Sequence, residues 1–99
     1  MSARRIELRA IGPNGVFVVT GQTAKSLAAL VAARKRGITA LEVNSWAYRL
    51  GAYVHELRHR HGLAIETQRE PHEGGWHGRY VLHSNVAIAD AGQPERRAA

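Results

Sequence analysis

One stretch constrains this chain more than any other: residues 39–62, TALEVNSWAYRLGAYVHELRHRHG. Thr39 and Glu42 have the spacing of a capping box, in which each side chain bonds the backbone N–H of the other residue, so a helix is expected to begin here. A second helix is expected over residues 50–61. Its apolar stripe is defined on a wheel of about 100° per residue by Leu50, Tyr53, Val54, Leu57 and His61. Gly62 follows as a left-handed stop, which predicts two short helices joined by a tight turn.

The side of the second helix opposite that stripe is polar and basic. It carries Arg49, Ala52, His55, Glu56 and His59. Two helices joined by a tight turn, with the second presenting a polar face, are typical of a helix-turn-helix whose second helix enters the major groove of DNA.

The charge of the whole chain agrees with an anionic partner. The formal net charge is +6 over 99 residues, with a pI near 10.8, which places nucleic acid first among partners. There are no cysteines, so disulfides and thiolate metal sites are excluded and a cytoplasmic location is expected. The N-terminus lacks the apolar region of a signal peptide, and the longest apolar run, Leu27–Ala33, is too short to span a bilayer, so we expect a soluble protein without a membrane partner.

Two elements are expected ahead of this stretch. Residues 4–20 alternate around a Gly-Pro-Asn-Gly turn and predict a β-hairpin, whose second strand, Val16–Val19, is apolar on both faces. One face needs cover from later strands or from a second subunit, which would make the hairpin a homodimer interface. A helix capped by Thr23 is expected from Ala24 to about Arg36, ending at Gly37. In the next helix, the one expected to begin at Thr39, Trp46 is expected to be a core residue.

After Gly62 the apolar period changes from 3.6 to 2. This predicts a strand over residues 63–68, a loop over residues 71–78 and a returning strand over residues 79–83, which together form a wing behind the third helix. Residues 84–99 are rich in Ala and predict a disordered tail, so the domain is expected to span residues 1–83.

This order of elements resembles that of small winged-helix proteins of bacteria and their phages. Three segments resemble those proteins as well: residues 49–58 (RLGAYVHELR), residues 62–67 (GLAIET) and residues 79–82 (RYVL). The likeness covers roughly residues 17–83. It implies an α+β winged helix-turn-helix fold, a three-helix bundle with a C-terminal β-hairpin wing, to which this chain adds the N-terminal hairpin. It also implies DNA binding. Gly51 departs from the family pattern, in which a small polar residue would cap the helix.

The residues expected to contact DNA lie on the third helix and the wing. On the helix and the turn before it they are Tyr48, Arg49, Ala52, His55, Glu56, His59 and Arg60; on the wing they are His72, Trp76, His77 and Arg79. Glu56 could accept from a cytosine or pair with Arg60 four residues on. Trp76 could reach a groove or fold back onto the domain.

The sequence HELRH at His55–His59 matches HExxH, the zinc-binding motif of metallopeptidases. We reject that interpretation because the third histidine is missing, because Arg58 would bring charge into a buried helix, and because the chain is too short for a substrate cleft. A looser site with His55, His59 and His72 or His77 stays conceivable, but no metal, cofactor or enzymatic activity is predicted.

The sequence therefore predicts a sequence-specific double-stranded DNA-binding protein, acting in transcription regulation in a bacterium or phage. The alternative is a winged-helix module for protein interaction or assembly that does not bind DNA.

Overall fold

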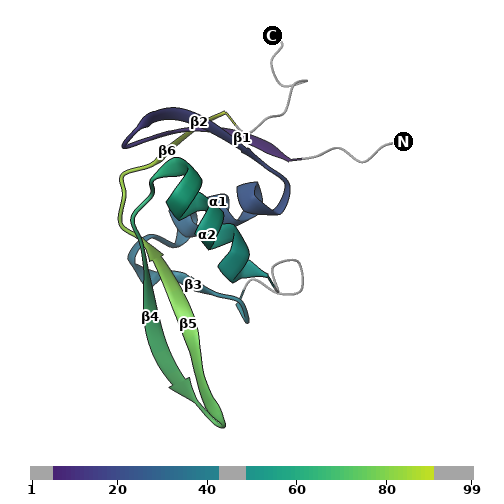
Figure 1. Ribbon diagram of the computed structural model, residues 1–99, viewed down its shortest axis with the longest axis vertical. Coiled ribbons are helices and arrows are strands. Elements are labelled where there is room, and N and C mark those ends of the chain that lie inside the picture. Colours follow the sequence, from purple (N-terminus) through teal and green to yellow (C-terminus); the bar gives the residue numbers. More distant parts are fainter. Residues whose placement is uncertain (1–5, 43–48, 91–99) are drawn as a thin grey trace, which may run out of the picture.

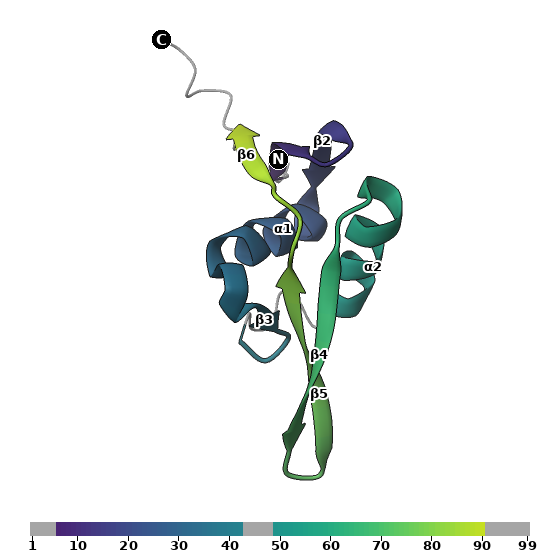
Figure 2. The ribbon, with the colours of Figure 1, turned by 90° about the vertical axis from the view of Figure 1, so that its left-hand side faces the viewer.

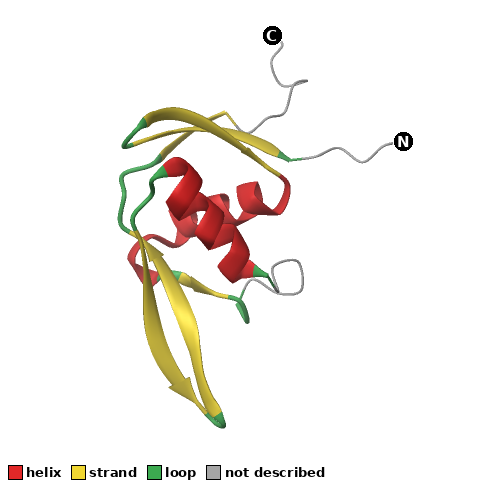
Figure 3. Ribbon diagram, in the orientation of Figure 1, coloured by secondary structure: helices red, strands yellow, loops and turns green. Residues whose placement is uncertain are grey.

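The computed structural model describes residues 6–42 and 49–90 (Figure 1). In chain order its elements are β1 (Glu7–Gly12), β2 (Gly15–Thr20), α1 (Gly21–Ala33), the 3-10 helix η1 (Arg34–Arg36), β3 (Ile38–Thr39), α2 (Leu50–His61), β4 (Ile65–His72), β5 (Gly75–Leu82) and β6 (Ala87–Asp90). The strands form two three-stranded sheets, with orders β2-β1-β6 and β3-β5-β4. The helices lie between the two sheets (Figure 3).

The predicted N-terminal hairpin is confirmed. β1 and β2 pair antiparallel from Glu7 opposite Thr20 to Gly12 opposite Gly15, around a Pro13-Asn14 turn. Alternate residues face the helices, and among them Leu8, Ala10 and Val19 are buried. The alternation that predicted the hairpin therefore places one face of this sheet on the core.

The prediction of a disordered tail from Ser84 onward is wrong for residues 87–90. These residues form β6, which pairs with β1 on the edge away from β2, with Ile88 opposite Ala10. Val86 and Ile88 pack against the core. The segment is short and rich in alanine, so its strand character comes from the free edge of β1 and not from its own propensity.

Helix α1 begins earlier than predicted. Its first residue is Gly21, so Thr23 is not the cap but lies buried within the first turn. The α-helix ends at Ala33, and the basic run Arg34–Arg36 forms a 3-10 turn that closes at Gly37. Leu27 and Leu30 are completely buried, so one side of this helix lies in the core.

The capping box predicted at Thr39 is formed. The backbone N–H of Thr39 donates to Glu42 Oε1 at 3.3 Å, and the backbone N–H of Glu42 donates to Thr39 Oγ1 at 3.1 Å. Trp46 of the helix expected to follow this box, and Tyr48 of the turn expected after that helix, lie outside the described residues. The described parts of the chain contain two α-helices, α1 and α2, so a three-helix bundle is not confirmed.

Helix α2 has the predicted bounds and stripe. Leu50, Val54 and Leu57 are buried in the core, and Gly62 ends the helix in the left-handed conformation with φ 69°. No side chain caps its first turn, where Arg49 occupies the N-cap position. Neither helix is long and apolar enough to cross a membrane, within the part of the chain that the structure describes.

The wing is longer than predicted. β4 and β5 pair over their full length, up to His72 opposite Gly75, so the expected loop over residues 71–78 shrinks to a turn at Glu73 and Gly74. Pro71 and the glycines suggested a loop, but Pro71 lies on β4, which is an edge strand, where a missing N–H costs no ladder hydrogen bond. The paired strands project well beyond the helices (Figure 1).

Candidate nucleic-acid interface

The outer side of α2 is open to solvent. Ala52, His55 and His59 are exposed along it, and the two imidazole rings lie with centroids 4.2 Å apart. Arg49 at the start of the helix and Arg60 near its end are also exposed. The helix therefore presents small, hydrogen-bonding and cationic side chains on a single surface.

Glu56 is held by groups of this chain. Its carboxylate accepts a hydrogen bond from Thr23 Oγ1 at 3.1 Å and lies 3.7 Å from the Arg60 guanidinium. Of the two interpretations of Glu56, the pairing with Arg60 is formed, and the bond from α1 was not expected. Glu56 therefore ties α2 to α1.

Arg58 fastens α2 to the base of the wing. Its guanidinium donates to the backbone oxygen of Ile65 through Nε at 2.9 Å and Nη2 at 2.6 Å, and to Thr67 Oγ1 at 2.7 Å. The Ile65 carbonyl is at the first residue of β4, so this side chain fixes the strand against the helix.

One face of the β4–β5 hairpin lies on the same side as α2. By register and alternation this face is made of Thr67, Arg69, Pro71, Trp76, Gly78 and Tyr80. Two contacts place α2 over it: the bond from Arg58 to Thr67, and the Tyr80 hydroxyl oxygen, 3.4 Å from where a Cβ on Gly51 would stand. Figure 2 shows α2 beside the base of this hairpin. We call this side of the hairpin the helix-side face.

Arg69 and Trp76 form a pair on the helix-side face. The Arg69 guanidinium carbon lies 4.4 Å from the centroid of the indole, which is a cation–π contact. Trp76 is nevertheless 53% exposed, so it stays on the wing surface and does not fold back into the core. Arg69 was missed because the predicted strand ended at Gln68. Extending the alternation of β4 by two residues would have found it.

The other predicted wing residues lie on the opposite face. There His77 Nε2 lies 3.0 Å from Glu70 Oε1, and its Nδ1 lies 2.8 Å from His72 Nδ1. Arg79 continues this face of β5. The wing residues singled out from the sequence are therefore divided between two sides, and only Trp76 shares a side with α2.

The guanidinium of Arg79, predicted to contact DNA, is bound by other groups of this chain. All five N–H groups of its guanidinium have acceptors: Glu70 takes two, Glu42 takes two and the Arg36 backbone oxygen takes one. The hydrogen bonds from Arg79 lower the pKa values of Glu70 and Glu42, and those two carboxylates raise the pKa of Arg79. We therefore leave Arg79 out of the candidate interface.

The histidines do not gather into a metal site. Within the described residues no three His, Asp or Glu side chains are grouped closely enough to hold an ion. The carboxylate of Glu56, the glutamate of the HExxH sequence, accepts a hydrogen bond from Thr23 and pairs with Arg60. His61, expected in the core, is partly buried and stacks on Phe17 with ring centroids 4.6 Å apart, and burial lowers its pKa.

Comparison with known proteins agrees with this architecture. A family model described as a winged helix domain matches residues 16–92, more than half of the chain. The chain belongs to this winged helix family. No curated protein and no solved structure matches the chain.

Winged helix domains are typically DNA-binding modules without enzymatic activity, and this is the general type of protein to which the family assigns the chain. In this winged helix domain β4 and β5 form the wing. The matched region begins at Val16 and extends past β6, so β6 lies within the family match and β1 lies outside it.

Proposed function

We propose that this winged helix domain binds double-stranded DNA in a sequence-specific manner and regulates transcription in a bacterium or phage. Helix α2 would enter the major groove with its N-terminal outer face. Arg49 would reach a guanine edge or phosphate, and the wing would lie along the adjacent backbone. The residues proposed to contact DNA are Arg49, Ala52, His55, His59, Arg60, Arg69 and Trp76.

The observation that carries this proposal is the division of charge between the two faces of the wing. Arg69 and Trp76 lie on the helix-side face, and Arg58 reaches onto it from α2. The carboxylates of Glu66 and Glu70 lie on the other face, where His83 lowers the pKa of Glu66 through a 2.7 Å hydrogen bond. A polyanion approaching α2 would therefore meet cations and an exposed aromatic ring, while Glu66 and Glu70 point away.

The double variant His55→Glu/His59→Glu is expected to weaken DNA binding by about tenfold or more, because it places two carboxylates where phosphates or base edges would lie. Affinity is measured by fluorescence anisotropy on a duplex obtained by selection from random DNA, at several salt concentrations. The matched control is Ala28→Glu/Ala32→Glu, which has the same i,i+4 spacing and adds the same charge on exposed positions of α1.

Equal losses in the two double variants would mean that only net charge matters and would contradict recognition by α2. For the wing, Arg69→Ala should lower the slope of log affinity against log salt by about 1. Wild-type protein whose affinity for DNA does not respond to salt would contradict the proposal as a whole.

A second candidate function, a protein-interaction surface, is favoured by the outer face of the N-terminal sheet. Ile11, Val16 and Val18 are 48%, 66% and 43% exposed there, and Ile11 stands directly opposite Val16. β2 is also an edge strand. We propose that two copies of the chain pair here as a homodimer, because a twofold pairing of β2 with β2 would satisfy the free edge of β2 and set Val16 and Val18 of one copy beside those of the other.

The double variant Val16→Lys/Val18→Lys is therefore expected to be monomeric at concentrations where the wild-type protein is dimeric, since charges on an edge strand oppose pairing. Sedimentation equilibrium measures this, and Ala28→Lys/Ala32→Lys on α1 is the charge-matched control. A wild-type protein that stays monomeric at millimolar concentration would refute the homodimer.

A further inference from the structure

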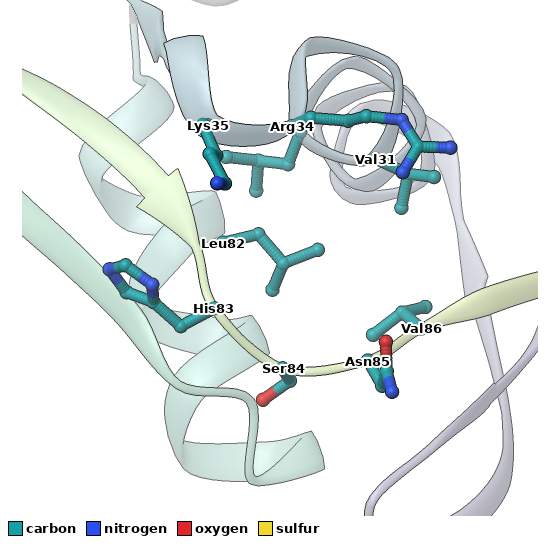
Figure 4. Close-up of a pocket in the computed structure, with 9 residues that line it drawn as sticks. Val31, Arg34, Lys35, Leu82, His83, Ser84, Asn85 and Val86 are labelled. Atoms are coloured by element: carbon teal, nitrogen blue, oxygen red, sulfur yellow. The ribbon is translucent and has the colours of Figure 1, made fainter.

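A cavity of about 320 Å³ lies on a part of the domain that the proposed DNA contacts do not use (Figure 4). It opens between the end of α1 with η1 and the connector, residues 83–86, that joins the wing strand β5 to β6. Its apolar wall is made of Leu30, Val31, Leu82 and Val86. A volume of this size is within the range of small-molecule sites, which begins at about 300 Å³.

Two cations stand at the mouth of this cavity. Arg34 and Lys35 are exposed and line it, and in Figure 4 they lie across the cavity from Ser84 and Asn85. Within the described residues, neither side chain makes an ion pair with a carboxylate. This differs from Arg79, all of whose donors are used. The mouth therefore offers unpaired positive charge above an apolar wall.

Ser84 lies on the other side of the cavity, with its hydroxyl oxygen turned away from the two cations (Figure 4). Its oxygen accepts the backbone N–H of Ala64 at 2.8 Å. The ring of His83 is turned to Glu66, at 2.7 Å. An anion in the mouth would therefore meet the side chains of Arg34 and Lys35.

The backbone of Arg34 is strained. Its φ of 53° and ψ of −130° lie where side chains with a Cβ are disfavoured, and it is the one non-glycine residue with a positive φ in the described parts of the chain. A glycine would hold this conformation without strain. Strain kept at a position that lines a cavity points to a function for the side chain.

From these observations we propose that the cavity binds a small carboxylate with an apolar body, of the size of a medium-chain fatty acid. The carboxylate would bind Arg34 and Lys35 at the mouth, and the chain would lie against Leu82 and Val86. The apolar wall disfavours a bare inorganic anion, and the two cations disfavour a neutral lipid.

The test titrates decanoate into the full chain. Binding is monitored by two-dimensional amide NMR and by thermal unfolding. We expect saturable shifts centred on Leu30, Val31 and residues 82–86. 1-Decanol should bind about tenfold more weakly or worse, because it lacks the charge that Arg34 and Lys35 would pair. The assay contains no DNA, so its result is independent of the proposed function.

The decisive variant is Arg34→Gly. It should weaken decanoate binding by about tenfold or more while its Tm stays at or above that of the wild-type protein, because glycine relieves the positive φ. Arg36→Ala, which removes an exposed cation that does not line the cavity, is the matched control and should bind like the wild type. Unchanged binding by Arg34→Gly, equal binding of decanol, or shifts centred on α2 would each overturn the proposal.

Discussion

Replacing Gly37 with alanine is expected to destabilise the domain by about 3 kcal/mol or more, enough to unfold much of the protein at moderate temperature. Gly37 has φ 71° and ψ −177°, a region that is essentially restricted to glycine. An added Cβ would also lie 2.6 Å from the backbone oxygen of Tyr80 and 2.7 Å from Val81 Cγ2. The first of these atoms belongs to β5 and can move only if β3 separates from it.

The control for this variant is Gly15→Ala. Gly15 also has a positive φ, 107°, but nothing lies within 4 Å of the place where its Cβ would be. Urea unfolding of both variants separates backbone strain from steric conflict, so Gly15→Ala should lose only about 1–3 kcal/mol. Losses of equal size would show that the close approach of β3 to β5 is not what requires a glycine at position 37.

Arg58→Ala is expected to cost about 2–3 kcal/mol of folding free energy, because it removes charge-assisted bonds and leaves the backbone oxygen of Ile65, the buried first residue of β4, without this donor. The Ile65 backbone oxygen loses both of its bonds from this side chain, and Thr67 loses one. Chemical unfolding followed by circular dichroism measures the change.

The neighbouring variant Arg60→Ala is the matched control for Arg58→Ala. Arg60 lies on the same helix with its side chain 73% exposed, and its one ion pair, to Glu56, spans 3.7 Å. A surface pair of this kind contributes about 0–1 kcal/mol, so Arg60→Ala should leave stability almost unchanged. If Arg58→Ala instead left stability intact and weakened only DNA binding, Arg58 would be a DNA contact and not a structural clamp.

Much of the fold could be predicted from local sequence pattern. The alternation in residues 4–20 and the stripe of residues 50–61 each describe one element on its own, and the capping box at Thr39 joins residues three positions apart. Such signals are local because the periods of strands and helices follow from backbone geometry alone.

The exposed side of α2 was predictable for the same reason. Once Leu50, Val54 and Leu57 define the buried stripe, the exposure of His55 and His59 follows from the helical period. The sequence by itself thus determined which helix offers its surface and which residue types that surface carries.

Only the tertiary structure decided the partners of the long polar side chains and the sides of the wing. Arg79 bonds Glu42, thirty-seven positions away, and Thr23 bonds Glu56, thirty-three positions away. No local pattern marks such pairs, because they depend on how distant elements pack. The same holds for β6, which became a strand by pairing with β1, and for the placement of Arg69 with Trp76 on the side of α2, which depends on the register of β4 against β5.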